Sequence, residues 1–183
     1  MRLFFGLPVD ENVRNRVLTV QDRLRSVAGK VKWVESANLH FTLRFLGETA
    51  DGEVERVAQA AEGIRGLPVG LALRDVGAFP GPGRARVIWV GLARGGETLA
   101  QISRELDARL EAKLGLAAEP RGFTPHLTIG RVKAPAPNEA LSRSLEALRD
   151  EEFGEFTAER FMLYRSTLRP EGPVYHVLRE YGA

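Results

Sequence analysis

The sequence predicts an α+β fold in which two pseudo-symmetric lobes, each an antiparallel sheet backed by helices, face each other across a central cleft. Several stretches alternate apolar and polar residues, as half-buried strands do, and longer ones space their apolar residues by three and four, as amphipathic helices do. A His-x-Thr-x pattern occurs twice, at residues 40–43 and 126–129, on two of the alternating stretches. We therefore expect residues 1–183 to form a single domain made of two lobes with one motif each.

The first half of the chain alternates strand and helix patterns. Apolar residues from Val13 to Val27 recur at spacings of 4, 3, 4 and 3, which predicts a helix that Asp10 opens and Gly29 closes. Asp51 is placed to cap a second helix that continues through Ile64. We expect strands at residues 2–7, 32–34 and 39–47 and helices at residues 10–29 and 51–64.

The second half repeats this pattern around a loop rich in glycine and proline at residues 80–86. Apolar, β-branched stretches on both sides of this loop predict a hairpin. Leucines and an isoleucine at helical spacing run up to Gly115, and Asn138 is placed to cap a further helix. We expect strands at residues 69–79, 87–92, 123–132, 156–168 and 173–180.

The first motif strand has two chemically distinct faces. The apolar residues at positions 39, 41, 43 and 45 share one parity, whereas His40, Thr42 and Arg44 share the other. Because successive side chains of a strand point to opposite faces, we expect Leu39, Phe41, Leu43 and Phe45 in the core. The histidine, threonine and arginine then stand together on the cleft side.

The second motif strand resembles the first, with one difficulty. His126 and Thr128 share one parity, and Leu127 and Ile129 share the other. Arg131 has the parity of the two apolar residues, so a regular strand turns it away from the cleft. We expect a β-bulge at Gly130 to turn this arginine back toward the cleft.

Two histidines on opposite walls of a cleft suit acid–base catalysis at phosphorus. An ordinary histidine pKa near ~6.5 lets one imidazole accept a proton while the other donates one. Hydroxyl groups of Thr42 and Thr128 can hold non-bridging phosphate oxygens, and a nearby arginine offsets their charge. The chemistry needs no metal, and two histidines without any cysteine make a poor zinc site.

Composition limits the cellular compartment and the kind of RNA partner that we expect for the protein. The chain has no cysteine and no apolar run near the ~18 residues of a membrane span, so we expect a cytoplasmic protein that does not enter a membrane. A net charge of +2 is too small for an extended grip on long RNA. We expect recognition of an RNA end, by a monomer.

Residues 38–48 and 123–131 together resemble the motifs of the two-histidine phosphoesterase superfamily. Within it, the chain is similar to the RNA 2′,3′-cyclic phosphodiesterases first named 2′-5′ RNA ligases (LigT or ThpR). The similarity extends beyond the motifs to the opening, central and closing segments. These segments are residues 1–7, 76–80, 86–91, 163–168 and 172–175.

This resemblance implies metal-independent hydrolysis of a ribose 2′,3′-cyclic phosphate to a 2′-phosphomonoester, without a cofactor. It implies that His40 and His126 share the roles of acid and base. We assign the base to His126 and the acid to His40, and the reverse assignment stays open. Thr42, Thr128 and Arg131 take the phosphate-binding role, and weak, reversible 2′-5′ RNA ligation is implied as well.

Two other functions remain open. The same fold can serve as a module that binds an RNA end or a nucleotide without turnover, although a pure binder has no need of two titrating groups. A phosphodiesterase acting on small cyclic nucleotides or on ADP-ribose cyclic phosphate is the alternative within the enzyme class. Phe5, Phe45 and Trp33 are either core residues or surfaces on which a base stacks.

Overall fold

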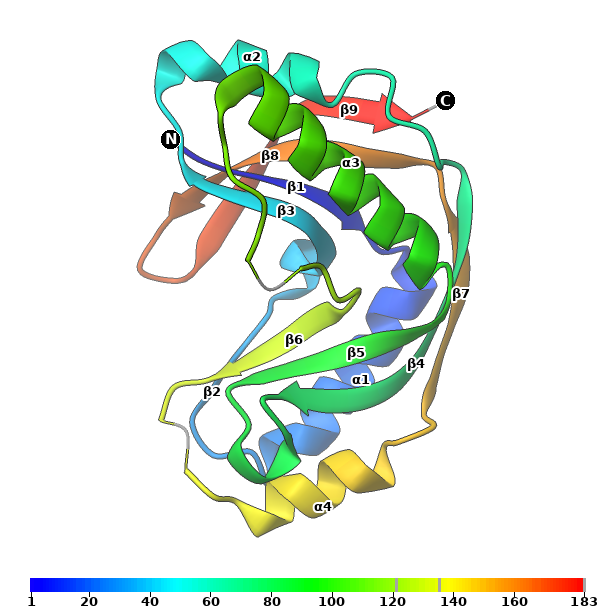
Figure 1. The fold of residues 1–183 in the computed structure, drawn as a ribbon. Helices are drawn as coiled ribbons and strands as arrows, with labels where there is room; N and C mark the ends of the chain where they lie inside the picture. Colours follow the sequence, from blue (N-terminus) through cyan, green and yellow to red (C-terminus); the bar gives the residue numbers. More distant parts are fainter. Residues whose placement is uncertain (121, 135, 183) are drawn as a thin grey trace.

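Nine strands form one continuous antiparallel sheet in the computed structural model, which describes residues 1–120, 122–134 and 136–182. The strand order is β7-β4-β5-β6-β3-β1-β8-β9, and β2 pairs with β6 beside this path. The sheet is strongly curved (Figure 1). The strands are β1 (Arg2–Pro8), β2 (Val31–Trp33), β3 (His40–Glu48), β4 (Val69–Phe79), β5 (Val87–Arg94), β6 (Leu127–Val132), β7 (Glu152–Ala158), β8 (Arg160–Leu168) and β9 (Pro173–Gly182).

Four α-helices and three short 3₁₀ helices cover the sheet in the described ranges. The helix caps follow the sequence: an Asp10 carboxylate oxygen accepts from the Val13 amide at 2.8 Å, and the Asn138 side chain accepts from the Leu141 amide at 3.0 Å. The helices are α1 (Glu11–Arg25), η1 (Ser36–Asn38), η2 (Asp51–Glu53), α2 (Val54–Ala60), η3 (Pro82–Arg84), α3 (Gly96–Leu114) and α4 (Glu139–Ala147).

The sheet consists of two matching sets of four strands that meet at its centre. Counting outward, one lobe has the order β3-β1-β8-β9 and the other has β6-β5-β4-β7, and the motif strands are joined where Phe41 pairs with Leu127. This confirms the predicted α+β class with two antiparallel lobes. The lobes are not the two halves of the chain, however, because β8 returns to pair with β1, and β9 pairs with β8.

The helices also cross between the lobes. Helix α1, which follows β1 in the chain, packs on β6 and β7, whereas α3 packs on β3. Figure 1 shows α2 and α3 together over the lobe of β1 and β3, and α1 and α4 beside the other lobe. Each lobe therefore depends on chain segments from both ends of the sequence.

Several boundaries differ from the prediction, among them the ends of the first two helices, which lie at Arg25 and Ala60 rather than at residues 29 and 64. The stretch 156–168, predicted as one strand, belongs to two strands that pair at different places, β7 with β4 and β8 with β1. Neither glycine nor proline marks the break at Glu159. The second motif strand begins at Leu127 rather than at residue 123. Asp51 does not cap a helix with its side chain, because it lies within η2 and pairs with the N-terminal amine at 3.7 Å.

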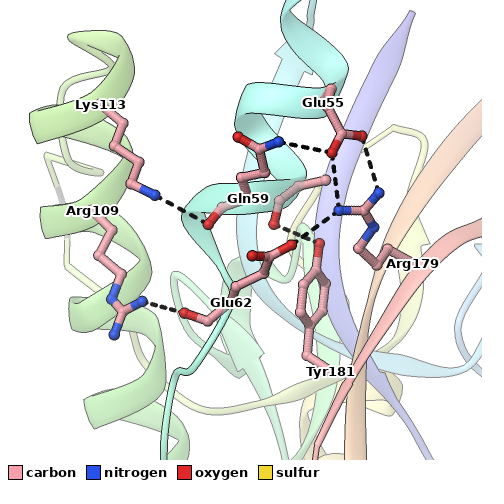
Figure 2. Close-up of polar contacts among 8 residues, drawn as sticks. Glu55, Gln59, Glu62, Arg109, Lys113, Arg179 and Tyr181 are labelled. Atoms are coloured by element: carbon pink, nitrogen blue, oxygen red, sulfur yellow. Dashed lines mark hydrogen bonds and ion pairs between the residues drawn. The ribbon is translucent and has the colours of Figure 1, made fainter.

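Helix α2 is fixed to its neighbours by polar contacts (Figure 2). The Arg179 guanidinium of β9 pairs with Glu55 at 3.0 Å and with Glu62 at 3.2 Å. The Tyr181 hydroxyl donates to the Ala58 carbonyl at 2.9 Å, and the Tyr181 ring stacks on Phe161 in the core. These contacts close the outer side of the β1–β3 lobe.

No helix among the described residues is long and apolar enough to cross a membrane.

Candidate functional site

A cavity of about 400 Å³ lies against the paired motif strands. Its wall contains four of the five side chains that the sequence predicts for the site: His40, Thr42, Thr128 and Arg131. The fifth, His126, immediately precedes β6 and lies outside the set of described residues that line this cavity.

The pairing between the strands explains why the two motifs meet. Phe41 of β3 pairs with Leu127 of β6 in an antiparallel register. At the neighbouring positions, this antiparallel register sets His40 across from Thr128 and Thr42 across from His126. The two His-x-Thr motifs thus form one crossed group at the centre of the sheet.

Both histidines are oriented by the same backbone contact. The Nδ1 atom of His40 lies 2.7 Å from the Asn38 carbonyl, and the Nδ1 atom of His126 lies 2.6 Å from the Thr124 carbonyl. A carbonyl oxygen can only accept, so Nδ1 carries the proton in each neutral ring and donates it. The Nε2 atom is then free to accept a proton, and in His40 it lies 2.9 Å from the Thr42 hydroxyl oxygen.

The surroundings favour the neutral form of both imidazoles. Burial is the largest influence and lowers the pKa of His40 and of His126 below 6.5. The backbone carbonyl bonds raise each pKa, and the positive charge of Arg131 lowers both. Arg131 therefore acts electrostatically on both histidines.

Aromatic rings enclose His40 and border His126. The His40 ring lies 4.8 Å from Phe4 and meets Tyr175 edge-on at 5.2 Å, and the His126 ring meets Phe79 edge-on at 5.1 Å. Burial raises the pKa of the Tyr175 phenol, which lines the cavity. This phenol therefore remains protonated and able to donate a hydrogen bond.

A β-bulge follows each motif. In β3, Thr42 pairs with Gly6 of β1 and Arg44 pairs with Phe5, so Leu43 is an extra residue. In β6, Thr128 pairs with Trp89 of β5 and Gly130 pairs with Ile88, so Ile129 is extra in the same way. A bulge interrupts the alternation, and side chains beyond it point to the opposite face from the one that parity predicts.

The two bulges exchange the faces of the two arginines. Arg131 enters the cavity, which confirms the predicted re-aiming by a bulge next to Gly130. Arg44, predicted on the face of His40, is instead 6% exposed and pairs with Asp107 of α3 at 2.8 Å and with Glu119 at 3.0 Å. The prediction for Arg44 is wrong because alternation does not continue through Leu43.

Phe45 is also displaced from its predicted position. It was expected in the core, yet it is 43% exposed and lines the cavity, with the Arg2 guanidinium 5.5 Å from its ring centroid. Phe5 is fully buried against Phe161 and belongs to the core. Phe45 and Arg131 each stand three residues after a motif threonine, so one lobe presents a ring where the other presents a cation.

Sequence reasoning missed the two side chains that hold the bulges in place. The Gln21 amide of α1 donates to the Ile129 carbonyl at 2.8 Å and to the Val34 carbonyl at 2.9 Å. The Ser103 hydroxyl of α3 donates to the Leu43 carbonyl at 2.7 Å. Both donors are polar residues on otherwise apolar helix faces, and that exception to the helix pattern is the signal that could have identified them.

Among the described residues, no group of three or more His, Cys, Asp or Glu side chains is arranged to hold a metal ion.

Comparisons with known proteins agree with this geometry. The family model described as LigT like Phosphoesterase matches the chain twice, over residues 7–89 and 90–175. A protein named RNA 2′,3′-cyclic phosphodiesterase from Archaeoglobus fulgidus is 38% identical, covering 98% of both chains. A protein of the same name from Methanothermobacter thermautotrophicus is 37% identical, covering 96% of this chain and 95% of the relative.

Solved structures show the same architecture. TT0787 of Thermus thermophilus superposes with a TM-score of 0.83 at 33% identity, covering 100% of this chain and 97% of that one. Escherichia coli LigT in complex with 3′-AMP superposes with a TM-score of 0.77 at 25% identity, covering 99% of this chain and 97% of that one.

We predict that Gln21→Leu lowers the free energy of unfolding by about 1–3 kcal/mol, because the Val34 and Ile129 carbonyls each lose the hydrogen bond from the Gln21 amide. The Ile129 carbonyl keeps only its bond from the Val34 amide. Urea denaturation measures the change in free energy. Gln101→Leu, on the exposed side of α3, is the matched control and should change the free energy of unfolding by no more than about 0.5 kcal/mol. Equal effects of the two variants would contradict the role of Gln21.

Proposed function

The chain belongs to the family of LigT-like phosphoesterases, and from this membership we propose that it hydrolyses RNA-terminal 2′,3′-cyclic phosphate to a 2′-phosphomonoester. The observation that carries the proposal is the matched pair of histidines, each with Nδ1 held by a carbonyl, so that Nε2 is the nitrogen available for proton transfer. A pure binding module has no need of this duplicated arrangement. We also propose that residues 1–183 act as one domain with one motif per lobe.

The reaction is an in-line displacement at phosphorus. His126 takes a proton from water as the water oxygen bonds to phosphorus, and the bond from phosphorus to the 3′ oxygen breaks. His40, which starts this step as the imidazolium, gives its Nε2 proton to that oxygen, which leaves a 3′-hydroxyl and a 2′-phosphate. Each histidine ends in the protonation state that the other had at the start, and the two exchange protons with solvent before the next turnover.

The phosphate is held by three side chains from the cavity wall. Thr42 and Thr128 donate their hydroxyl protons to the non-bridging oxygens, and Arg131 balances the negative charge that develops on them. Phe45 offers an exposed ring on which the base of the terminal nucleotide stacks. None of these groups requires a cofactor.

The substrate is an RNA end, and the enzyme works as a cytoplasmic monomer in this proposal. A net charge of +2 provides few phosphate contacts beyond the cleft. Weak 2′-5′ ligation uses the same groups, with the 5′-hydroxyl of a second RNA attacking phosphorus in place of water and the 3′ oxygen leaving as before. Hydrolysis of small cyclic nucleotides is the alternative that fits the same site.

Phosphorus NMR of adenosine 2′,3′-cyclic phosphate with EDTA-treated protein tests the proposal. We predict a 2′-monophosphate product, and a rate about 10²–10⁴-fold lower in His40→Ala and in His126→Ala, because each variant loses one proton-transfer group. Binding without turnover by the unaltered protein would place it among the binding modules. A 3′-monophosphate product would reverse the choice of leaving oxygen.

A substrate with sulfur at the bridging 3′ position separates acid from base. A thiolate leaves without protonation, so we predict that His40→Ala regains most of its rate on this substrate. His126→Ala should be equally slow on the sulfur and oxygen substrates, because water still needs a base. The opposite pattern of rescue would exchange the two roles.

We predict a bell-shaped pH profile of kcat/KM centred below pH 6.5, because both histidine pKa values are lowered from that value, mainly by burial. Arg131→Gln removes a positive charge that lowers both, so both limbs of the bell should move to higher pH. Steady-state rates across the pH range measure the position of the bell independently of its height. A shift to lower pH in this variant would contradict the electrostatic role of Arg131.

A further inference from the structure

The connecting segment between α3 and β6, residues 115–125, carries the carbonyl that orients His126. This carbonyl belongs to Thr124. The structure describes residues 115–120 and 122–125 of the segment, and over these residues it forms neither helix nor strand. Its backbone hydrogen bonds there stay within the segment or return to α3, and none joins it to the sheet. The placement of Thr124 against the sheet therefore depends on side chains.

Arg44 of β3 connects this segment to the sheet. One terminal nitrogen of its guanidinium donates to the Ala117 carbonyl at 2.5 Å, and the other lies 3.0 Å from a Glu119 carboxylate oxygen. The third nitrogen, Nε, lies 2.8 Å from a carboxylate oxygen of Asp107 in α3. The Arg44 side chain is 7% exposed, so the guanidinium is enclosed by the strand, the helix and the connecting segment.

Asp107 fixes the direction in which the guanidinium points. Burial raises the pKa of the Asp107 carboxyl, and the positive charge of Arg44 is the largest influence that lowers it. The two side chains therefore form a partly buried ion pair between α3 and β3. A guanidinium is a rigid planar fork, so holding Nε at the helix aims both terminal nitrogens at the connecting segment.

The chain that leads to His40 is held in a corresponding way. The Val34 amide donates to the Ile129 carbonyl of β6 at 3.0 Å, and Gln21 donates to the carbonyls of both residues. In each lobe, the chain approaching one histidine is thus bound to the strand of the other motif. On the His40 side the bond joins backbone groups, whereas on the other side the Arg44 side chain makes it.

The far end of the connecting segment is held by apolar packing. A Cβ atom at Gly96, the first residue of α3, would lie 3.5–3.6 Å from the Pro125 ring, and Phe123 packs against the core. Apolar contacts have no preferred direction, so they leave the segment able to shift along the helix. The charge-assisted hydrogen bonds of Arg44 are directional and fix its position.

A buried arginine can also serve stability alone. Such a role needs only a carboxylate partner, and Asp107 on the neighbouring helix supplies one. The other two partners of Arg44 lie in a segment without regular structure, a few residues before the carbonyl that orients His126. This choice of partners indicates that the arginine places the segment.

Building on the proposed function, we propose that Arg44 is a positioning residue for His126. It holds the connecting segment so that the Thr124 carbonyl accepts the Nδ1 proton, and Nε2 is left for proton transfer. Arg44 touches neither the substrate nor the histidine and acts through the segment alone.

Nitrogen-15 NMR of the two imidazoles in the free protein tests this without turnover. At a pH well above both pKa values, we expect both rings of the unaltered protein to carry the proton on Nδ1. In Arg44→Met, His126 should become a mixture of the two tautomers. His40 should keep its tautomer, because its carbonyl belongs to Asn38, whose amide is bound to the Pro173 carbonyl at 2.9 Å.

Kinetics supply the second measurement. Arg44→Met should lower kcat for adenosine 2′,3′-cyclic phosphate about 10- to 100-fold, as misplacement of a catalytic group does. The KM should change little, because the phosphate-binding side chains stand on the paired strands. Arg44→Lys should recover only part of kcat, since an ammonium group cannot occupy all three positions of the fork.

Arg109→Met is the matched control. Arg109 also ties α3 to a neighbouring segment, through the Glu62 carbonyl (Figure 2), and pairs with Glu105 at 2.5 Å. Both partners lie outside the connecting segment. This variant should therefore keep the His126 tautomer and kcat, even where its free energy of unfolding falls.

A second variant keeps the test open if Arg44→Met does not fold. Glu119→Gln removes one ion pair at a side chain that is 48% exposed, and the His126 tautomer should shift in the same direction to a smaller extent. An unchanged His126 tautomer in the folded variant, or an unchanged kcat in an active Arg44→Met enzyme, would overturn the role of Arg44. If no cyclic phosphate is hydrolysed by the unaltered protein, the proposed hydrolysis fails, whereas the tautomer measurement still decides whether Arg44 positions His126.

Discussion

The site depends on two β-bulges whose carbonyl groups accept hydrogen bonds from side chains of the covering helices. Each motif strand carries one extra residue directly after its threonine, Leu43 in β3 and Ile129 in β6. A helix behind each lobe donates a side-chain hydrogen bond to the carbonyl of this extra residue: Ser103 to Leu43, and Gln21 to Ile129, which also accepts from a backbone amide. Gln21, Ser103 and Arg44 are the buried polar side chains of the described structure. The first two hold the bulges, and Arg44 is the side chain that the first bulge turns away from the cavity.

The bulges allow two similar strands to present different side chains to the cavity. Up to the threonine, both motifs follow the same alternation, and each histidine is oriented by a carbonyl two residues upstream. Beyond the bulge, the residue facing the cavity is a phenylalanine in one lobe and an arginine in the other. The shared part suits acid and base on the two sides of a phosphate. The part that differs gives one lobe a surface for a base and the other a charge for the phosphate.

The sequence predicts the direction of a side chain correctly where apolar and polar residues alternate without interruption. His40, Thr42 and Thr128 could be placed on the cleft face because the alternation holds as far as the threonines. Arg44 could not, because nothing local marks a bulge at Leu43, whereas Gly130 indicated the second one. The division of 156–168 into two strands was hidden for a similar reason, since the break at Glu159 carries no turn residue. The partners of Gln21 and Ser103 lie far away in sequence, so only tertiary structure identifies them.

The exchange of strands and helices between the lobes has a consequence for catalysis. A reaction with one histidine on each lobe needs the separation of the two imidazoles to stay fixed, and two hinged lobes would let it vary. Here β3 and β6 are neighbours in one continuous sheet, β8 and β9 return to the lobe of β1, and α1 and α3 each pack on the strand that holds the motif of the other half of the chain. Opening the cleft would therefore break contacts in both cores at once. The same crossing brings a helix from each half of the chain to the bulge in the other half, so rigidity of the cleft and placement of Arg131 come from one topological feature.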